Sequence, residues 1–274
     1  MNAGADICVV SVHKLGLGFE QGAVYHLQGS LVDPVRLKQC ADLLATTSTN
    51  VLIYAGLDGW RRHMVQSGKE ELGAALQLVE RSRARINEVP GMHVLHDELI
   101  REEASHDFDP LHVLIDVKQL GISGYQAADW LRAERRIDVG LNDHGRIEAT
   151  FSQSDTQETA DRLLEALGAL VQAAPEMPSP SPVLLPDSSA LEMPTVRLPR
   201  DAFFGPVEVV PAKEAEGRIA AEQITPYPPG VPAILPGERI NGQVIDYLLS
   251  GVEAGMVLPD PADPELKTIR VARE

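Results

Sequence analysis

A serine, a histidine and a lysine lie close together near the start of the chain, at Ser11, His13 and Lys14. They follow an apolar, β-branched run at residues 6–12, which is typical of a parallel-sheet strand buried on both faces. Open α/β sheets bind ligands at the carboxyl ends of such strands. A lysine amine kept reactive there by desolvation or by a nearby cation can form a Schiff base with an aldehyde. The pair His13-Lys14 alone is weak evidence, because an ordinary solvated loop commonly carries both residue types.

Three glycines follow the lysine, at Gly16, Gly18 and Gly22, and glycine lets backbone amides approach an anion closely. Their spacing differs from the dinucleotide fingerprint, so the series also fits a flexible turn. Gly68-Lys69 lacks the upstream glycine and the following hydroxyl residue of a phosphate-binding loop. Neither pattern defines a nucleotide site.

A histidine-rich stretch between residues 93 and 112 is the obvious place to look for a metal site. No helix or turn spacing within it makes a defined set of ligands, so solvated loop histidines explain the pattern and we expect no metal. The residues considered are His93, His96, His106, His112, Asp107 and Asp109.

The residues Val-Val-Ser-Val-His-Lys at 9–14 resemble the segment that carries pyridoxal phosphate in the ornithine/lysine/arginine decarboxylases, and Gln21 stands where that family also has glutamine. Residues 55–62 look like the family's helix after the lysine loop. Residues 217–232, with Pro-Gly-Glu at 236–238, are similar to the family's C-terminal domain. The chain departs from the family pattern at Leu17, Glu20 and Gly22, where the family has small or hydroxyl residues.

The resemblance implies a pyridoxal-phosphate enzyme that decarboxylates arginine, lysine or ornithine to the corresponding amine. Lys14 would carry the cofactor, and Ser11 and His13 would donate hydrogen bonds to its phosphate. The segment around Glu222 is expected to form a rigid, proline-set turn that packs the last domain, and recognition of the distal amine of the substrate by Glu222 is the alternative. The family's active sites lie at a dimer interface, so the resemblance also implies a homo-oligomer.

The elements that must position these residues can be read along the chain. After the first strand we expect a second apolar run at 23–27, a helix over 33–44 begun by Asp33-Pro34, and two helices over 50–64 and 69–87. Short strands follow near Val94 and at 111–117, then a helix over 125–135. Strands at 137–141 and 146–151 flank a turn, and a helix over 155–173 closes an antiparallel α+β unit. A helix over 241–254 and a strand at 268–271 end the chain.

Composition and resemblance together give a predicted fold class and domain plan. We expect an α/β chain with part of a fold-type-I, aminotransferase-like large domain at 1–91 and an α+β small domain at 92–174. A linker rich in proline and serine at 175–198 would lead to a small decarboxylase C-terminal domain at 199–274.

Charge and hydropathy exclude several partners. The chain has 24 basic and 40 acidic residues, a net charge of -16, which disfavours contact with nucleic acid or anionic membranes. No apolar stretch is long enough to span a bilayer and no signal peptide is recognisable, so we expect a cytoplasmic protein. Its two cysteines, Cys8 and Cys40, are expected to be reduced thiols.

The family places the carboxylate for the pyridine nitrogen, the stacking ring and most of the phosphate cradle before the lysine segment. We therefore expect a truncated chain with little activity alone. Half of a split enzyme and a non-catalytic remnant are the alternatives. An aminotransferase of the same cofactor fold is the enzymatic competitor, but it would not be expected to carry the Tyr-Pro-Pro-Gly segment at 227–230.

Overall fold

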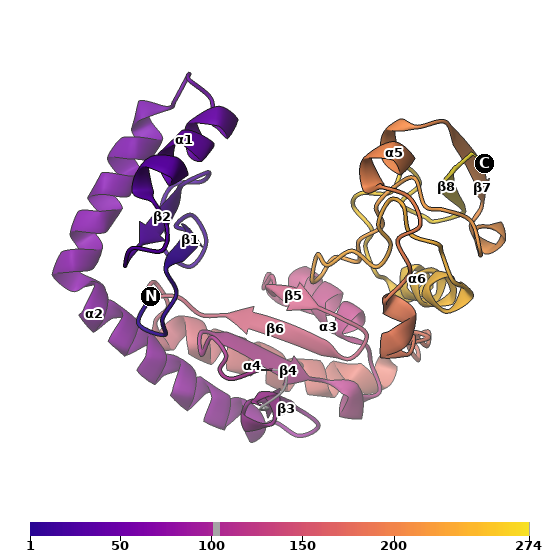
Figure 1. The fold of residues 1–274 in the computed structure, drawn as a ribbon. Helices are drawn as coiled ribbons and strands as arrows, with labels where there is room; N and C mark the ends of the chain where they lie inside the picture. The colour runs from indigo at the N-terminus through magenta and orange to yellow at the C-terminus, as the bar shows by residue number, and fades with distance from the viewer. Residues whose placement is uncertain (101–104, 274) are drawn as a thin grey trace. The chain divides into compact units, whose positions relative to one another are not determined.

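The computed structural model describes residues 1–100 and 105–273 (Figure 1). Contacts along the chain divide it into two compact units, Met1–Ala75 and Leu76–Glu274, called here the N-terminal unit and the C-terminal unit. The division falls inside a long helix. Each unit is described by itself.

The N-terminal unit begins with the strands β1 (Ile7–Ser11) and β2 (Ala23–Leu27), which pair antiparallel with each other. The sequence predicted a strand buried on both faces inside a parallel sheet, and this prediction is wrong for the chain as it folds here. β2 is the sole partner of β1 among the described residues, and a two-stranded ribbon cannot bury both of its faces. Helix α1 (Pro34–Leu44) follows, and the Asp33 carboxylate caps it by accepting a hydrogen bond from the backbone of Val35 at 2.9 Å.

A single helix, α2 (Val51–Asn87), replaces the two helices that the sequence predicted. The expected break lay between residues 64 and 69, a stretch that includes Gly68. One glycine inside a helix costs only about 1 kcal/mol, which a long helix tolerates. The missing side chain at Gly68 also makes room, because a β-carbon there would lie 2.7 Å from the Met64 Cε.

The first layer of the C-terminal unit is a four-stranded antiparallel sheet in the order β3-β4-β6-β5. Its strands are β3 (His93–Leu95), β4 (His112–Asp116), β5 (Leu141–Asn142) and β6 (Arg146–Thr150). Helix α4 (Gln157–Ala173) and the end of α2 lie on the same side of this sheet (Figure 1). Val113, Ile115 and Ile147 alternate along the strands and are buried. The predicted antiparallel α+β unit is confirmed.

Between the strands, α3 (Gly124–Trp130) begins with a capping box, in which Ser123 and Gln126 satisfy each other's backbone amides. It runs into a π-helical turn at Leu131–Arg135. The strand predicted at 137–141 is shorter in the structure, since β5 covers Leu141–Asn142 alone. Short 3-10 turns lie at Asp97–Leu99, Lys118–Leu120, Ala174–Glu176, Ser188–Leu191 and Ala212–Glu214.

The last part of the chain folds around helix α6 (Gly242–Ala254) and the antiparallel pair β7 (Val207–Pro211) and β8 (Thr268–Ala272). The short helix α5 (Pro199–Phe204) and β7 were not anticipated from the sequence. Part of the expected linker contacts this layer: Leu184 N donates to Ser250 Oγ at 2.9 Å, and Asn241 Nδ2 donates to Ala190 O at 2.7 Å. Met193 is buried in the core that α6 and β8 share.

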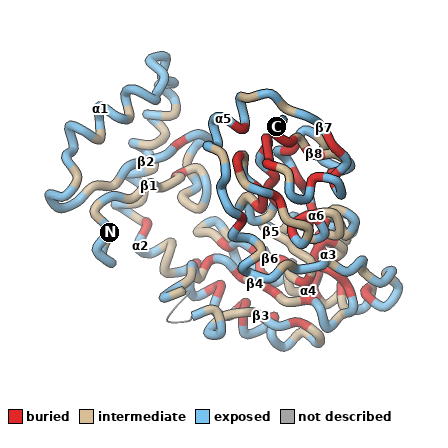
Figure 2. Tube along the Cα trace, turned by 45° about the vertical axis from the view of Figure 1, so that its right-hand side comes forward, coloured by how far each residue is buried: buried red, intermediate tan, exposed pale blue. Residues whose placement is uncertain are grey.

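Burial is distributed unevenly between the two units. Buried positions gather in the C-terminal unit, whereas the N-terminal unit is mainly exposed or intermediate (Figure 2). No helix in the described part of the chain is both long and apolar enough to cross a membrane.

Candidate active site

The turn that carries Lys14 is closed by backbone hydrogen bonds. His13 N donates to Gly22 O at 3.2 Å, Gly18 N donates to Val12 O at 2.9 Å, and Leu17 N donates to Lys14 O at 3.0 Å. Val12 is fully buried and lies at the centre of the turn. The backbone under Lys14 is therefore fixed at several points.

Gly16 and Gly18 are required because their backbones pack closely against Val12. A β-carbon at Gly16 would lie 2.6 Å from Val12 O, and one at Gly18 would lie 2.5 Å from Val12 Cγ1. Leu17, between them, has φ of 56°, a region that side chains other than glycine rarely adopt. The turn thus has a tight, unusual backbone at the place where the candidate lysine stands.

The side chains on this turn differ in how many polar contacts they make. His13 Nδ1 lies 2.9 Å from Gly22 O, and a carbonyl can only accept, so Nδ1 carries the proton. His13 Nε2 faces Glu20 Oε1 at 3.7 Å. Lys14 is exposed, and neither its amine nor the Ser11 hydroxyl forms a hydrogen bond or ion pair with any described residue.

The structure therefore brings three of the four predicted site residues, Ser11, His13 and Lys14, onto one turn. A fixed backbone beneath an unengaged amine fits a lysine that forms a covalent bond to an aldehyde cofactor. The Ser11 hydroxyl is free to meet a polar group of such a ligand, whereas His13 Nε2 already faces Glu20 Oε1. These roles remain predictions.

Glu222, the fourth predicted residue, belongs to the C-terminal unit and is buried. Its Oε2 accepts from Ala262 N at 2.8 Å, and its Oε1 accepts from Arg270 N at 2.6 Å. Both oxygens thus hold backbone amides of two other segments together. These contacts favour a structural role, and contact with a substrate remains an untested prediction.

Sequence reasoning did not find a buried carboxylate in the sheet, at Glu148. Its Oε1 lies 2.8 Å from His112 Nδ1 and also accepts from Thr150 Oγ1 at 2.9 Å. His112 was interpreted as a solvated histidine, whereas its ring is half-exposed and paired. The register His112↔Thr150 and Leu114↔Glu148 places these side chains on one face of the sheet, and a strand prediction without register could not show that. Among the described residues no group of three or more potential ligands could hold a metal ion.

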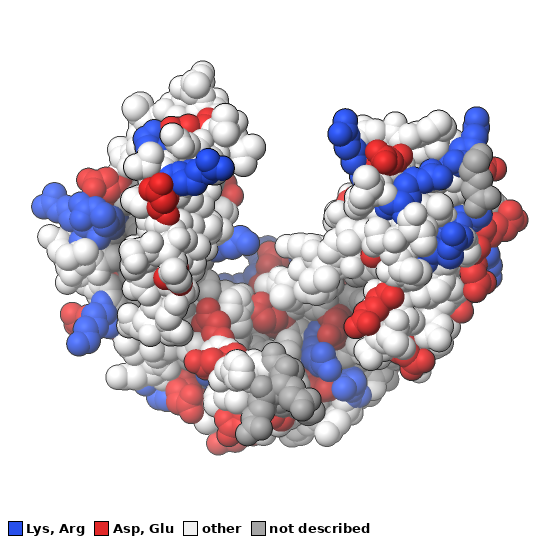
Figure 3. Space-filling view, viewed as in Figure 1, with Lys and Arg blue, Asp and Glu red and all other residues white. Residues whose placement is uncertain are grey.

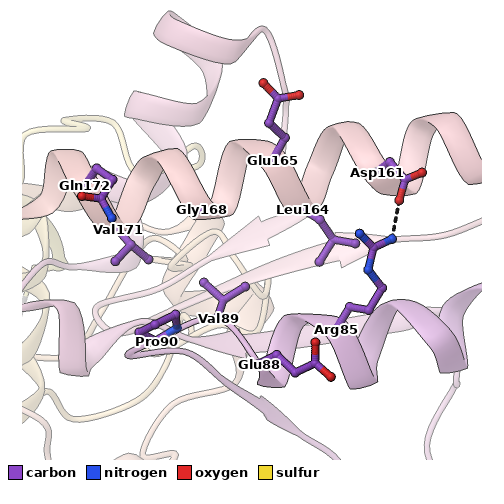
Figure 4. Close-up of a pocket in the computed structure, with 10 residues that line it drawn as sticks. All are labelled: Arg85, Glu88, Val89, Pro90, Asp161, Leu164, Glu165, Gly168, Val171 and Gln172. Atoms are coloured by element: carbon purple, nitrogen blue, oxygen red, sulfur yellow. Dashed lines mark hydrogen bonds and ion pairs between the residues drawn. The ribbon is translucent and has the colours of Figure 1, made fainter.

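A groove of about 500 Å³ lies between the end of α2 and α4 (Figure 4). The ion pair between Arg85 and Asp161 closes one end of it, and Glu88 and Glu165 line it as well. The hydrogen bond from Arg85 is the main reason why the pKa of the Asp161 carboxyl lies below its usual range. We find no nucleophile or buried unpaired group in the groove lining that would make it a reaction site.

Comparison with known families decides the ancestry of the chain. The model of the Orn/Lys/Arg decarboxylase major domain matches residues 1–159, and the model of the Orn/Lys/Arg decarboxylase C-terminal domain matches residues 190–261. The chain belongs to the Orn/Lys/Arg decarboxylase family. The family resemblance read from the sequence is thereby confirmed.

Two curated arginine decarboxylases of this family align over the whole chain. The arginine decarboxylase of Bacillus subtilis (strain 168) is 38% identical over 277 residues, which cover 100% of this chain and 56% of the relative. The arginine decarboxylase of Halalkalibacterium halodurans is 37% identical, with the same coverage. The constitutive ornithine decarboxylase of Escherichia coli is 48% identical over 75 residues, covering 26% of this chain and 10% of that protein. The chain thus spans about half the length of the curated arginine decarboxylases that it matches.

Solved structures of the decarboxylase family share the fold. The constitutive lysine decarboxylase of Escherichia coli superposes with a TM-score of 0.75 at 17% identity, covering 97% of this chain and 49% of that one. The mixed α/β fold is therefore that of about half of a lysine decarboxylase chain.

Proposed function

We propose that this chain forms part of a pyridoxal-phosphate-dependent decarboxylase of basic amino acids, with arginine as its substrate. The observation that carries the proposal is the Lys14 turn, a fixed backbone bearing an unengaged amine, in a member of the Orn/Lys/Arg decarboxylase family.

The residues of the turn suit the cofactor by their chemistry. The Lys14 amine would bond to the aldehyde carbon, with loss of the aldehyde oxygen as water. The Ser11 hydroxyl would donate to the phosphate. His13 would contact the cofactor through its Nε2, the ring nitrogen that does not face Gly22 O.

The chemistry that pyridoxal phosphate supplies when bound is an electron sink for the bond that decarboxylation breaks. In the reaction the bond from the α-carbon to the carboxylate breaks, carbon dioxide leaves, and a proton is added to the α-carbon. Lys14 holds the cofactor before the substrate amine displaces it, and its released amine can then hold a proton.

Arginine is favoured over lysine and ornithine by the pattern of relatives. The Bacillus subtilis and Halalkalibacterium halodurans arginine decarboxylases align along the entire chain, whereas the Escherichia coli ornithine decarboxylase aligns over 75 residues. The sequence alone left the three substrates open. We do not assign Glu222 to the distal group of the substrate, since both of its oxygens already accept backbone amides.

Activity is proposed for the complete enzyme rather than for these residues by themselves. The chain spans 56% of the Bacillus subtilis arginine decarboxylase, so the carboxylate that keeps the pyridine nitrogen protonated is expected from the remaining part. We also propose that the complete enzyme is a homo-oligomer, as its family relationship implies.

The test is release of labelled carbon dioxide from arginine, lysine and ornithine. The chain is assayed with pyridoxal phosphate, alone and together with the separately expressed remaining part of the Bacillus subtilis arginine decarboxylase. We expect release from arginine by the mixture, little by the chain alone, and none with Lys14→Ala. Faster release from lysine or ornithine would contradict the substrate. A keto acid product without carbon dioxide would contradict decarboxylation and indicate an aminotransferase.

A further inference from the structure

A hollow of about 260 Å³ in the C-terminal unit is lined by the chain after α3, by the end of β6 and by the first half of α4. It shares no lining residue with the groove between α2 and α4. Two of its apolar residues belong to the buried core, so part of its surface is firmly packed. We call it the Arg136 hollow, and its apolar residues are Ile137, Val139, Ala149, Phe151 and Leu163.

The acidic side chains of the Arg136 hollow already have donors within the protein. Asp138 forms an ion pair with Arg132. Asp155 Oδ2 accepts from Ser152 N at 2.8 Å, and its Oδ1 accepts from Thr159 Oγ1 at 3.0 Å. Both carboxylates of the lining are therefore engaged, and neither is left as an open acceptor for a cation.

The arginines of the Arg136 hollow, in contrast, keep unused donors. Arg162 Nη2 donates to Arg135 O at 3.0 Å and to Arg136 O at 3.4 Å, while its Nε and Nη1 have no partner among the described residues. The Arg136 side chain forms no hydrogen bond or ion pair in the described part of the chain. Arg135, the next arginine along, lies over the Trp130 ring, with its Cζ 5.5 Å from the ring centroid. Two guanidinium groups of the hollow can thus still bind an acceptor.

The backbone fixes the position of Arg136 beside Arg162. The π-helical turn Leu131–Arg135 ends at Arg136, whose φ of 54° is rare for a residue other than glycine. Its backbone N donates to Arg132 O at 3.2 Å, and its backbone O accepts from Arg162. Single π-helical turns are frequent at functional sites. The two arginines therefore come from different elements and are held together by hydrogen bonds.

Charge over the wider surface gives no general attraction for anions. The chain has a net charge of -16, and acidic and basic side chains are interspersed over the face of the C-terminal unit seen in Figure 3. A site for an anion must therefore depend on short-range donors rather than on a broad basic field. Arginine suits this role, because its planar guanidinium matches the two oxygens of a carboxylate.

We propose that the Arg136 hollow binds a small organic carboxylate. The carboxylate accepts hydrogen bonds from Arg136 and Arg162, and the apolar body of the ligand covers the apolar residues of the hollow. At about 260 Å³ the hollow is smaller than the sites that hold drug-sized ligands, so it suits a single ring or a short chain. The site belongs to the C-terminal unit alone and does not depend on the function proposed for Lys14.

Titration of the 274-residue chain with sodium benzoate tests the site. Calorimetry gives the dissociation constant, which we expect at about 1 mM or lower, and NMR should place the amide shift changes at residues 136–139 and 149–163. Arg136→Gln should weaken binding by about tenfold. Because the Arg136 side chain makes no polar contact, this variant should fold normally. Arg81→Gln, at an exposed arginine of α2 outside the hollow, is the matched control and should bind benzoate normally.

Two further probes separate the charge from the apolar contact. Benzylamine carries the same ring with the opposite charge and should not shift these amides. Inorganic phosphate carries the charge without an apolar body and should bind about tenfold more weakly than benzoate. Four results would overturn the proposal: no saturable benzoate signal, benzoate binding unchanged in Arg136→Gln, equal binding of benzylamine, or phosphate binding as tight as that of benzoate.

Discussion

The two units of this chain differ in what stabilises them. The C-terminal unit has a dense apolar core, in which side chains such as Leu167, Leu170 and Leu248 are fully buried. The N-terminal unit carries the residues with the most distinctive chemistry, yet it buries two apolar side chains among those described. The comparison teaches that the residues with candidate catalytic chemistry lie in the unit with little apolar core of its own, whereas the C-terminal unit has the core of an independent fold.

The difference between the units is tested most sharply by replacing one leucine with alanine in each unit. Leu248→Ala removes a fully buried side chain and should lower the free energy of unfolding by about 2–5 kcal/mol. Leu44→Ala, at a residue 91% exposed, should change it by no more than about 0.5 kcal/mol. Denaturant unfolding followed by circular dichroism measures both. Equal losses would contradict the account.

A substitution at Glu222 distinguishes a structural role of this residue from a role in substrate binding. Glu222→Gln keeps the size but leaves one acceptor oxygen for two backbone amides, so stability should fall by about 1–3 kcal/mol. Glu253→Gln, at an exposed residue of α6, is the control and should be neutral. A raised KM for arginine in the assembled enzyme, with unfolding unchanged, would instead support recognition of the substrate.

Helix caps give a smaller, matched test of the two units. Asn241 Oδ1 accepts from Val244 N at 3.0 Å and caps α6, and Asn241 Nδ2 donates to Ala190 O, so Asn241→Ala should cost about 1–2 kcal/mol of the unfolding free energy. Asp33 caps α1 in the same manner. Asp33→Ala should leave the main unfolding transition in place and speed hydrogen exchange locally in α1. A global loss from Asp33→Ala would mean that the N-terminal unit stabilises the whole chain.

The last effect is expected only at alkaline pH. Burial, followed by the neighbouring Tyr247 and Asp143, raises the pKa of Tyr125 to about 12. A raised pKa means that the folded state favours the protonated phenol. The corresponding stability is present below the ordinary pKa of 10 and is lost as pH rises towards 12. Tyr125→Phe should flatten the pH dependence of the unfolding midpoint in this window. An unchanged pH profile would exclude Tyr125 as its source.

The sequence predicted the second half of the fold better than the first. The antiparallel sheet and helices α4 and α6 follow from local alternation, caps and helical spacing, and their own neighbours in the chain complete them. The run at residues 6–12 carries the pattern of a strand buried on both faces, but β1 pairs with β2 alone among the described residues, and a local pattern does not show how many neighbours a strand has. The break expected between residues 64 and 69 is absent from α2, because a single glycine such as Gly68 is a weak interruption of a long helix.

The sequence allowed the residues of the candidate site to be predicted, but not the contacts that they make. Ser11, His13 and Lys14 were identified by their spacing and by family resemblance. The tautomer of His13 depends on Gly22 O, which only the closed turn brings near. The contacts of Glu222 could not be seen in the sequence, because its partners, the amides of Ala262 and Arg270, lie 40 and 48 residues away. The pairing of His112 with Glu148 requires the strand register.

The central claim, that Lys14 carries the cofactor, is tested most directly by borohydride reduction and peptide mass spectrometry. The chain is assembled with the remaining part of the Bacillus subtilis arginine decarboxylase, loaded with pyridoxal phosphate and reduced. The account predicts the pyridoxyl label on the peptide that contains Lys14, and its loss in Lys14→Arg. A stoichiometric label on any other lysine of either polypeptide, retained in Lys14→Arg, would contradict it.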